Sequence, residues 1–454
     1  MEFRNLTPFA ALCFSALDTQ DKEHPVIVMK VGYHLHPIAG QPGHCSAEVM
    51  DDEAVALCTA DRYFAEEGQS SVREESDLAP FKPRCDVIIN GHAHAPDGVP
   101  ATSWTAGIQL SVPATPPRIH VELPAPWQSG APLTEQQLYE WRDARLDAEH
   151  RRASAPTRDV LLEKHLRFSG PRHFQHGLFS GWRLFDAEPA TRVPLRWEYA
   201  FGGSSVLLDP AYPDSTAQPY LLNHACYCNP LGRGWIEKRH EKLAWAMNAA
   251  IQQLPAPQIE ALDRPVTHLH VTDHPDGDIS AADMAQLSAT YGYRPAGFGV
   301  LGRAWAPRLA LAGTYDESWQ ATRWPGLPED FNFAYWNGAP ADQQIDFAPP
   351  NLRLELFNLT PPELSHNGHL RIELPGHRPF VLMRMHNGVI LPLPMLTDTL
   401  CIDTDAMTLS LTHRVSLPNP DDIRVLEARF EIDPNAPLIT CVSPRQLHTE
   451  QETP

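Results

Sequence analysis

The sequence lacks any run of about 18 apolar residues, the minimum length of a helix that spans a membrane. Positive charge is also scarce: 36 Lys and Arg residues stand against 56 Asp and Glu residues, which gives a net charge of -20. Phosphate backbones repel an acidic surface, so this balance argues against nucleic-acid binding. The one basic cluster, residues 142–152, is interleaved with acids and is typical of a solvated helix face. We therefore expect neither a membrane nor a nucleic acid as a partner.

Cysteine is scarce as well, with 8 residues scattered over a chain of 454. No spacing predicts a disulfide framework, which favours a reducing compartment. Residues 8–17 (PFAALCFSAL) faintly resemble a signal peptide, but Glu2 offsets Arg4, the apolar run is short and no small-x-small cleavage site follows. We interpret this segment as a strand and expect a cytoplasmic protein.

Complete catalytic motifs are missing. The sequence contains no Gly-x-Ser-x-Gly elbow and no Walker A loop. Residues 297–302 (GFGVLG) match Gly-x-Gly-x-x-Gly in letters, but Pro307 prevents the helix that would have to follow. We interpret the segment as a glycine-rich turn and assign no catalytic residue and no cofactor.

Histidine pairs are the strongest sign of a metal. Their i, i+2 spacing places both imidazoles on one face of a strand; the pairs are His34 and His36, His92 and His94, and His268 and His270, with His274 following. The GHAH segment around the second pair is similar to one motif of metallophosphoesterases, but the other motifs that a two-metal site needs are absent. With 22 histidines, such pairs also arise by chance. We assign no metal site and keep a metal-dependent hydrolase as an alternative.

His224, Cys226 and Cys228 form a second cluster of metal-ligand types (HACYC). A zinc site would require another Cys/His pair at similar spacing, and none is present. We interpret the two cysteines as buried structural residues.

Proline is abundant. The 45 prolines are about twice the usual share of ~5%, which favours short strands and many loops. In residues 1–128, strands are predicted at 26–31, 85–91 and 103–112, the last from the alternation of Trp104, Ala106, Ile108 and Leu110. An acidic loop region, 51–77, separates the first two. We interpret residues 1–128 as an N-terminal β unit.

Helices are predicted at three places. The capping-box spacing of Thr134 and Gln137 begins a charged helical connector, 129–166. Within a mixed unit, 167–345, apolar residues at helical spacing predict a helix over 236–254, and a second helix starts at Ser280, capped with Asp283.

Residues 346–454 are predicted to form a C-terminal β unit with a polar tail from about 442. Leu352, Leu354 and Leu356 alternate with polar residues, and Asn387-Gly388 predicts a hairpin. Further strands are expected at 408–417 and 423–432. The fold class is therefore mainly β with a few helices, a loop- and proline-rich arrangement of several sandwich- or barrel-like units.

Residues 295–344 combine four tryptophans, two tyrosines, three phenylalanines, six glycines and five prolines. This composition predicts an irregular unit held together by aromatic rings and tight turns. Arg303 and Arg308 are expected to pair with Asp316 and Asp330 inside it.

This stretch closely resembles the domain of unknown function 2169 family, whose members act as type VI secretion accessory proteins. Other segments follow in the order of the family: NLTPFAALCF, VIVMKVGYHL, KPRCDVIINGHAHAP, VPLRWEYAFGG, NPLGRGW and LPAPQIEALDRP. The chain departs from the pattern at SWTAGIQLSV, which has no basic residue, and extends beyond it at 129–166 and after 350. The family has no known catalytic residues. Its motif positions are expected to be scaffold: Phe201, Gly202, Gly203, Arg303, Trp305, Tyr315, Asp316 and Trp319.

The resemblance implies a cytoplasmic adaptor that is not an enzyme. Such a protein stabilises an effector with a PAAR or PAAR-like domain and helps to load it onto the VgrG spike. The motifs assign no partner-binding residue. Besides the metal-dependent hydrolase, a structural subunit of the secretion apparatus remains an alternative.

Overall fold

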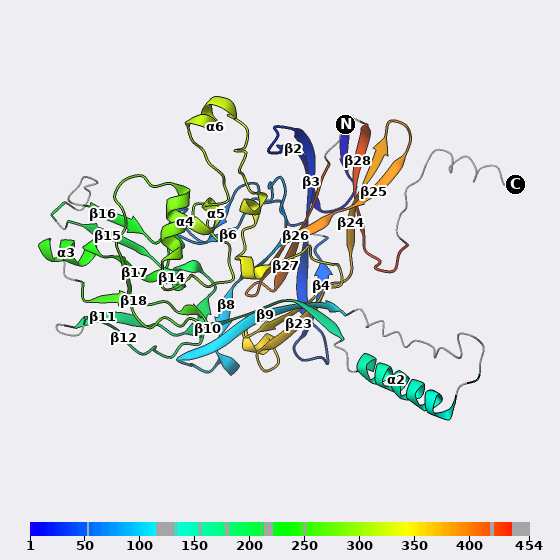
Figure 1. Ribbon diagram of the computed structural model, residues 1–454, viewed down its shortest axis with the longest axis horizontal. Helices are drawn as coiled ribbons and strands as arrows, with labels where there is room; N and C mark the ends of the chain where they lie inside the picture. Colours follow the sequence, from blue (N-terminus) through cyan, green and yellow to red (C-terminus); the bar gives the residue numbers. More distant parts are fainter. Residues whose placement is uncertain are drawn as a thin grey trace.

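The computed structural model describes residues 1–51, 54–114, 132, 134–153, 157–177, 181–209, 211–212, 221–247, 251–417 and 422–437. The fold is mainly β with a few helices, as the sequence predicted (Figure 1). No helix within these ranges is long and apolar enough to cross a membrane.

One curled, 12-stranded sheet forms a half-barrel at the centre of the molecule. Its order is β19-β10-β9-β22-β23-β4-β3-β27-β26-β7-β21, and β2 pairs with β3 outside this path. The strands are β2 (Ala10–Leu17), β3 (Glu23–Pro37), β4 (His44–Val49), β7 (Cys85–Asn90), β9 (Ser103–Pro113), β10 (Arg158–Ser169), β19 (Ile259–Ala261), β21 (Gln344–Ile345), β22 (Arg353–Phe357), β23 (His369–Glu373), β26 (Leu396–Asp403) and β27 (Thr408–Ser416).

Burial along these strands follows the predicted patterns. In β9, Trp104, Ala106, Ile108 and Leu110 are all buried, so the alternating side forms core as expected. The apolar run of β3 is buried throughout its middle because both faces of the sheet are covered there. The strands predicted at 26–31, 85–91, 103–112 and 408–417 are confirmed, as is the N-terminal strand within residues 8–17.

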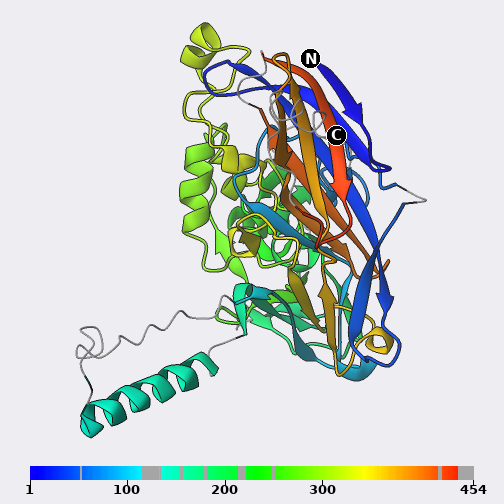
Figure 2. The ribbon, with the colours of Figure 1, turned by 90° about the vertical axis from the view of Figure 1, so that its right-hand side faces the viewer.

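A second sheet of four strands packs against the first and shares its core. Its order is β1-β28-β24-β25, from β1 (Glu2–Asn5), β28 (Ile423–Glu431), β24 (Arg378–Met385) and β25 (Ile390–Pro394). The predicted hairpin at Asn387-Gly388 joins β24 to β25, and Gly388 takes the positive φ of 83° that the turn requires. Figure 2 shows this sheet beside the long strands of the half-barrel.

The large sheet pairs strands that are far apart in the chain. β3 lies antiparallel to β27, and β7 lies parallel to β26. Strands from the predicted N-terminal, mixed and C-terminal units therefore belong to one sheet, whereas the unit boundaries themselves remain a prediction.

Smaller sheets form a lobe at one end, on the left in Figure 1. The strands of this lobe are β11 (His173–Gly177), β12 (Gly181–Leu184), β14 (Phe201–Gly202), β15 (Ser204–Leu208), β16 (Leu221–Ala225), β17 (Arg233–Glu237), β18 (Gln253–Pro255) and β20 (His270–Thr272). Two short strand pairs pack against the half-barrel instead: β5 (Arg62–Tyr63) with β6 (Val72–Glu74), and β8 (His92–His94) with β13 (Arg192–Pro194). The described helices are α2 (Glu135–Ala153), α3 (Arg239–Ala246), α4 (Ala281–Ala289), α5 (Ala306–Leu309) and α6 (Glu317–Thr322), with short 3-10 turns η1 (Pro96–Gly98), η2 (Trp197–Tyr199), η3 (Phe333–Trp336), η4 (Ala341–Gln343) and η5 (Pro362–Leu364).

Two of the helix predictions are confirmed by their caps. At the start of α2, the Thr134 hydroxyl accepts from the Gln137 N–H, and the Gln137 side chain accepts from the Thr134 N–H. At the start of α4, Ser280 and Asp283 form the same reciprocal pair. Residues 158–166, placed in the connector by sequence, are instead part of strand β10. Both ribbon views show α2 standing away from the sheets (Figures 1 and 2).

The helix predicted over 236–254 is wrong in extent, because α3 covers only Arg239–Ala246. Ile236 belongs to β17 and is buried in the lobe core with Trp235, while Leu254 belongs to β18. Three elements thus contribute apolar residues that happen to fall at helical spacing. Residues 248–250 lie outside the described part.

The predicted ion pairs within 295–344 are also wrong. Arg303 and Arg308 both bind Glu75, at 3.1 and 2.6 Å, and Arg303 also binds Asp61. The two expected acids are used locally: Asp316 caps α6, and Asp330 accepts from Thr314. The acidic segment 51–77 is therefore not merely a loop, because it supplies the carboxylates that neutralise arginines of the aromatic stretch.

Candidate functional site

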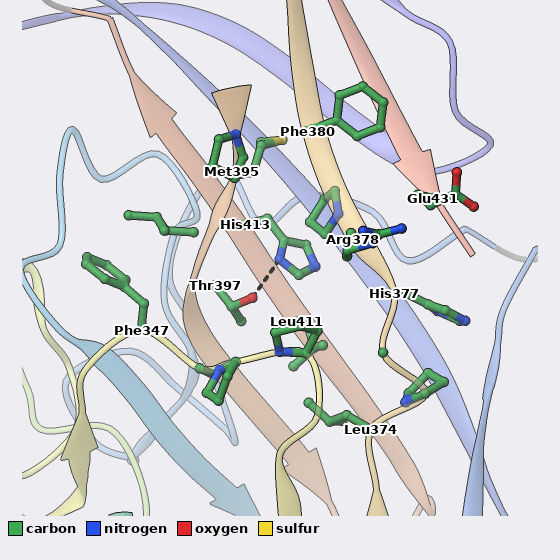
Figure 3. A pocket seen from close by; sticks show the side chains of 18 of the residues that line it. Phe347, Leu374, His377, Arg378, Phe380, Met395, Thr397, Leu411, His413 and Glu431 are labelled. Atoms are coloured by element: carbon green, nitrogen blue, oxygen red, sulfur yellow. Dashed lines mark hydrogen bonds between the residues drawn. The ribbon is translucent and has the colours of Figure 1, made fainter. Parts of the chain in front are cut away.

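A pocket of about 530 Å³ opens between the four-stranded sheet and the half-barrel. This volume lies in the range of small-molecule sites, roughly 300–1,000 Å³. Its walls are mostly apolar; the lining residues are Tyr33, Phe347, Ala348, Pro349, Pro350, Leu374, Pro375, Gly376, His377, Arg378, Pro379, Phe380, Pro392, Pro394, Met395, Leu396, Thr397, Leu411, His413, Glu431 and Pro437. Figure 3 shows how β24, β26 and β27 present these side chains to one space.

His413 lies at the centre of the pocket (Figure 3) and is 2% exposed. Its Nδ1 is 2.9 Å from the hydroxyl of Thr397, on the adjacent strand β26. Its Nε2 has no partner among the described residues. Burial lowers the pKa of His413 to about 3, so the ring is neutral near pH 7.

The pairing with Thr397 determines which ring nitrogen of His413 carries the proton. If the hydroxyl donates to Nδ1, only the Nε2–H is left without a partner. The reverse arrangement would leave two groups unpaired, the hydroxyl proton and the Nε2 lone pair. Because unpaired buried polar groups are costly, the first arrangement is favoured. His413, which lines the pocket, then carries one N–H donor without a described partner.

Arg378 adds a second donor and a positive charge. Its Nη2 donates to the carbonyl oxygens of Asp433 and Ala436, at 3.1 and 2.7 Å, while its Nε has no partner within the described ranges. Glu431 on the neighbouring strand β28 also lines the pocket, but it accepts from the N–H of Asp433 at 2.9 Å. Figure 3 places Arg378 between His413 and Glu431.

Proline is the commonest residue type in the lining, and it limits what the walls can bind. Pro392 and Pro394 lie on β25, the open edge of its sheet. Proline has no backbone N–H, so this edge lacks donors at two alternating positions and resists pairing with another strand.

Besides the pocket, the loop that carries α6 is a candidate binding feature on the surface. Arg323 ties it to the turn between β2 and β3 by donating to the Thr19 carbonyl and pairing with Asp21 at 3.0 Å. Trp319 donates to the Gly326 carbonyl at 2.9 Å, which closes the loop. Trp324 nevertheless remains 68% exposed. The loop projects from the body beside β2 (Figures 1 and 2).

The family motif positions fall into two groups. Phe201 and Trp305 are buried, Arg303 is ion-paired and Asp316 caps a helix. Tyr315 is instead 53% exposed and packs edge-on against Trp319, with ring centroids 4.7 Å apart.

The histidine pairs do not converge on a metal-binding cluster: within the described ranges, no group of three His, Cys, Asp or Glu residues could hold a metal ion. His34 and His36 are exposed on β3. His92 binds Asp405 at 2.7 Å, and His268 contacts the Tyr293 hydroxyl at 2.8 Å.

Cys226 and Cys228 are buried, as expected. Burial raises the pKa of Cys226 to about 12, so its thiol stays protonated. The nearby His274 packs on Tyr227, with ring centroids 4.5 Å apart, and burial lowers the pKa of His274 to about 4. This cluster belongs to the core of the lobe.

Comparison with known families identifies the chain. The model of the family described as an uncharacterized protein conserved in bacteria (DUF2169) matches residues 20–138 and 145–414. The chain belongs to the DUF2169 family. The interruption of the match falls within α2. No curated protein and no solved structure matches the chain.

Sequence reasoning missed the pocket of this DUF2169 protein. Its lining comes from β3, from loops near 347–350 and 374–377, and from β24 to β28. The closely spaced prolines at 349–350, 375–379 and 392–394 were the available signal. Nothing in the sequence indicated that they would face His413.

Proposed function

We propose that this protein is a type VI secretion adaptor that binds and stabilises an effector with a PAAR-like domain and helps to mount it on the VgrG spike. Membership of the DUF2169 family and the resemblance of its motifs to the accessory proteins support the proposal. The observation that carries it is the exposure of two aromatic side chains on the α6 loop, Tyr315 and Trp324. Trp and Tyr are enriched among the residues that anchor protein interfaces.

The loop is suited to this role because its backbone is fixed before the partner arrives. Arg323, Trp319 and Asp316 hold it through contacts with the β2–β3 turn and within the loop itself. A preorganised loop loses less conformational entropy on binding. Trp324 and Tyr315 then offer apolar area that only a partner would cover.

Co-expression with the PAAR-like protein encoded beside this chain tests the proposal. We expect a stable complex on size exclusion, an effector that is insoluble without the adaptor, and capture of VgrG by the complex. Trp324→Ala should weaken the complex by about 30-fold or more, the loss typical of an interface hot spot. Affinity is measured by calorimetry on the purified pair.

Trp245→Ala is the matched control, because Trp245 is 70% exposed on α3, at the far end of the lobe. It should change affinity by less than threefold. If effector and adaptor remain soluble and separate, the adaptor proposal is wrong. If the two tryptophan variants weaken the complex equally, the α6 loop is not the anchor.

A further inference from the structure

We propose that the pocket between the two sheets binds a small amphipathic acid: an unbranched apolar chain that ends in a carboxylate. The chain would lie along the proline-rich walls, with its head group on the Nε2–H of His413 and the Nε–H of Arg378. This inference is independent of the adaptor proposal, because it concerns a different part of the molecule.

The two unpartnered donors are the first argument. His413 lines the pocket and is almost completely buried, and its Nε2 has no partner among the described residues. Such groups are rare in native proteins, since each costs about as much as a lost hydrogen bond. Nε of Arg378, which lines the same pocket, also lacks a partner among the described residues.

Charge is the second argument. The described partners of Arg378 are neutral carbonyl oxygens, and no carboxylate in the described ranges lies within ion-pair distance of it. The carboxylate of Glu431 already accepts a backbone N–H and lies on the far side of Arg378 from His413 in Figure 3. An anionic head group beside His413 fits this arrangement better than a cationic one.

The apolar, proline-rich walls of the pocket indicate that the rest of the ligand is a hydrocarbon chain. Prolines supply no N–H, and the β25 edge lacks two donors, so a peptide strand could not replace the hydrogen bonds its backbone has with water. A hydrocarbon chain loses nothing there and gains from burial against Phe347, Met395 and Leu411.

Isothermal titration of the full-length protein tests the proposal with three soluble probes: decanoate, decan-1-ol and decyltrimethylammonium. We expect decanoate to bind one-to-one and most tightly. Affinity should rise by roughly fourfold for each methylene from hexanoate to decanoate, the increment for burying a CH₂ group. Absence of binding by all three probes, or equal binding of the cation, would overturn it.

Two variants test where the head group binds. His413→Leu should weaken the binding of decanoate at least tenfold, and Arg378→Met should abolish the preference for decanoate over decan-1-ol. Arg424→Met is the matched control, since Arg424 is exposed on β28 outside the lining and should leave binding unchanged. If Arg378→Met binds all three probes as the unmodified protein does, the assigned head-group site is wrong.

The other occupant to exclude is a segment of the effector. Leu411→Trp would fill the pocket from its floor. If this variant loses the effector while the unmodified protein binds none of the probes, the pocket receives polypeptide and the proposal fails.

Discussion

Arg308 shows how a single buried charge is accommodated in this protein. It is 2% exposed, and its guanidinium donates to Glu75 and to the carbonyl oxygens of Leu301 and Tyr335. Burial by itself would raise the pKa of Glu75, but Arg308, Lys82 and Arg303 outweigh it, and the pKa lies below its ordinary value. The pair therefore stabilises the fold only while Glu75 is charged.

Arg308→Met should lower the free energy of unfolding by about 3–5 kcal/mol at pH 7, because it removes one of the two arginines that bind the buried Glu75 carboxylate and leaves two carbonyls without their donor. A carboxyl with a lowered folded pKa contributes stability above its unfolded pKa, near 4.5, and loses it as the pH falls through the folded value. The difference between the two proteins should therefore shrink below pH 4.5. Urea denaturation at pH 7 and in acid measures it.

Arg145→Ala provides the control, because the Arg145–Glu149 pair lies exposed on α2. Its effect should stay within about 0.5 kcal/mol at any pH. If both variants lost the same free energy of unfolding, burial would not be the reason that the Arg308–Glu75 pair stabilises the fold.

At the scale of elements, local chemistry sets where helices begin. The Ser280 hydroxyl accepts from the N–H of Asp283. In turn, the Asp283 carboxylate accepts from the backbone N–H and the hydroxyl of Ser280. A capping box of this kind satisfies donors that the first helical turn leaves free. The Ser280 cap and the Asp283 N–H it serves lie within four residues, so the sequence was sufficient to predict where α4 begins.

Ser280→Ala should destabilise α4 by about 1 kcal/mol, the usual value of an N-cap. Hydrogen exchange of the α4 amides is the direct measurement, with faster exchange expected throughout the helix. Gln286→Ala, at an exposed position of the same helix, should leave exchange unchanged or slower, because alanine favours the helix. Unaltered exchange in Ser280→Ala would mean that tertiary packing alone holds α4.

At the scale of the whole molecule, the half-barrel depends on both ends of the chain. β3 lies between β4 and β27, and β22 lies between β9 and β23. Strands from the C-terminal part of the chain therefore occupy interior positions of the sheet, between strands from its N-terminal part. Leu354 and Leu356 of β22 are fully buried against the same core as Ile108 and Leu110 of β9.

A fragment of residues 1–345 should therefore not fold, because β3, β7 and β9 lose neighbours and expose the common core to water. We expect no cooperative urea transition and weak near-ultraviolet circular dichroism. A fragment of residues 1–437 keeps every described strand and should unfold cooperatively. Cooperative unfolding of the shorter fragment would instead establish 346–454 as a separate unit.

The sequence by itself determined the features that depend on neighbours in the chain. Strand periodicity identified β9 and β22, Asn387-Gly388 located a hairpin, and a capping box at Thr134 and an N-cap at Ser280 located helix starts. These patterns succeed because side-chain direction and turn geometry are set within a few residues.

Only the tertiary structure decided which distant residues meet. It paired Arg308 with Glu75, divided the apolar spacing of 236–254 among β17, α3 and β18, and gathered His413, Arg378 and the prolines around one pocket. Partner choice among distant segments depends on how sheets curl and pack, and residue spacing along the chain carries no record of that geometry.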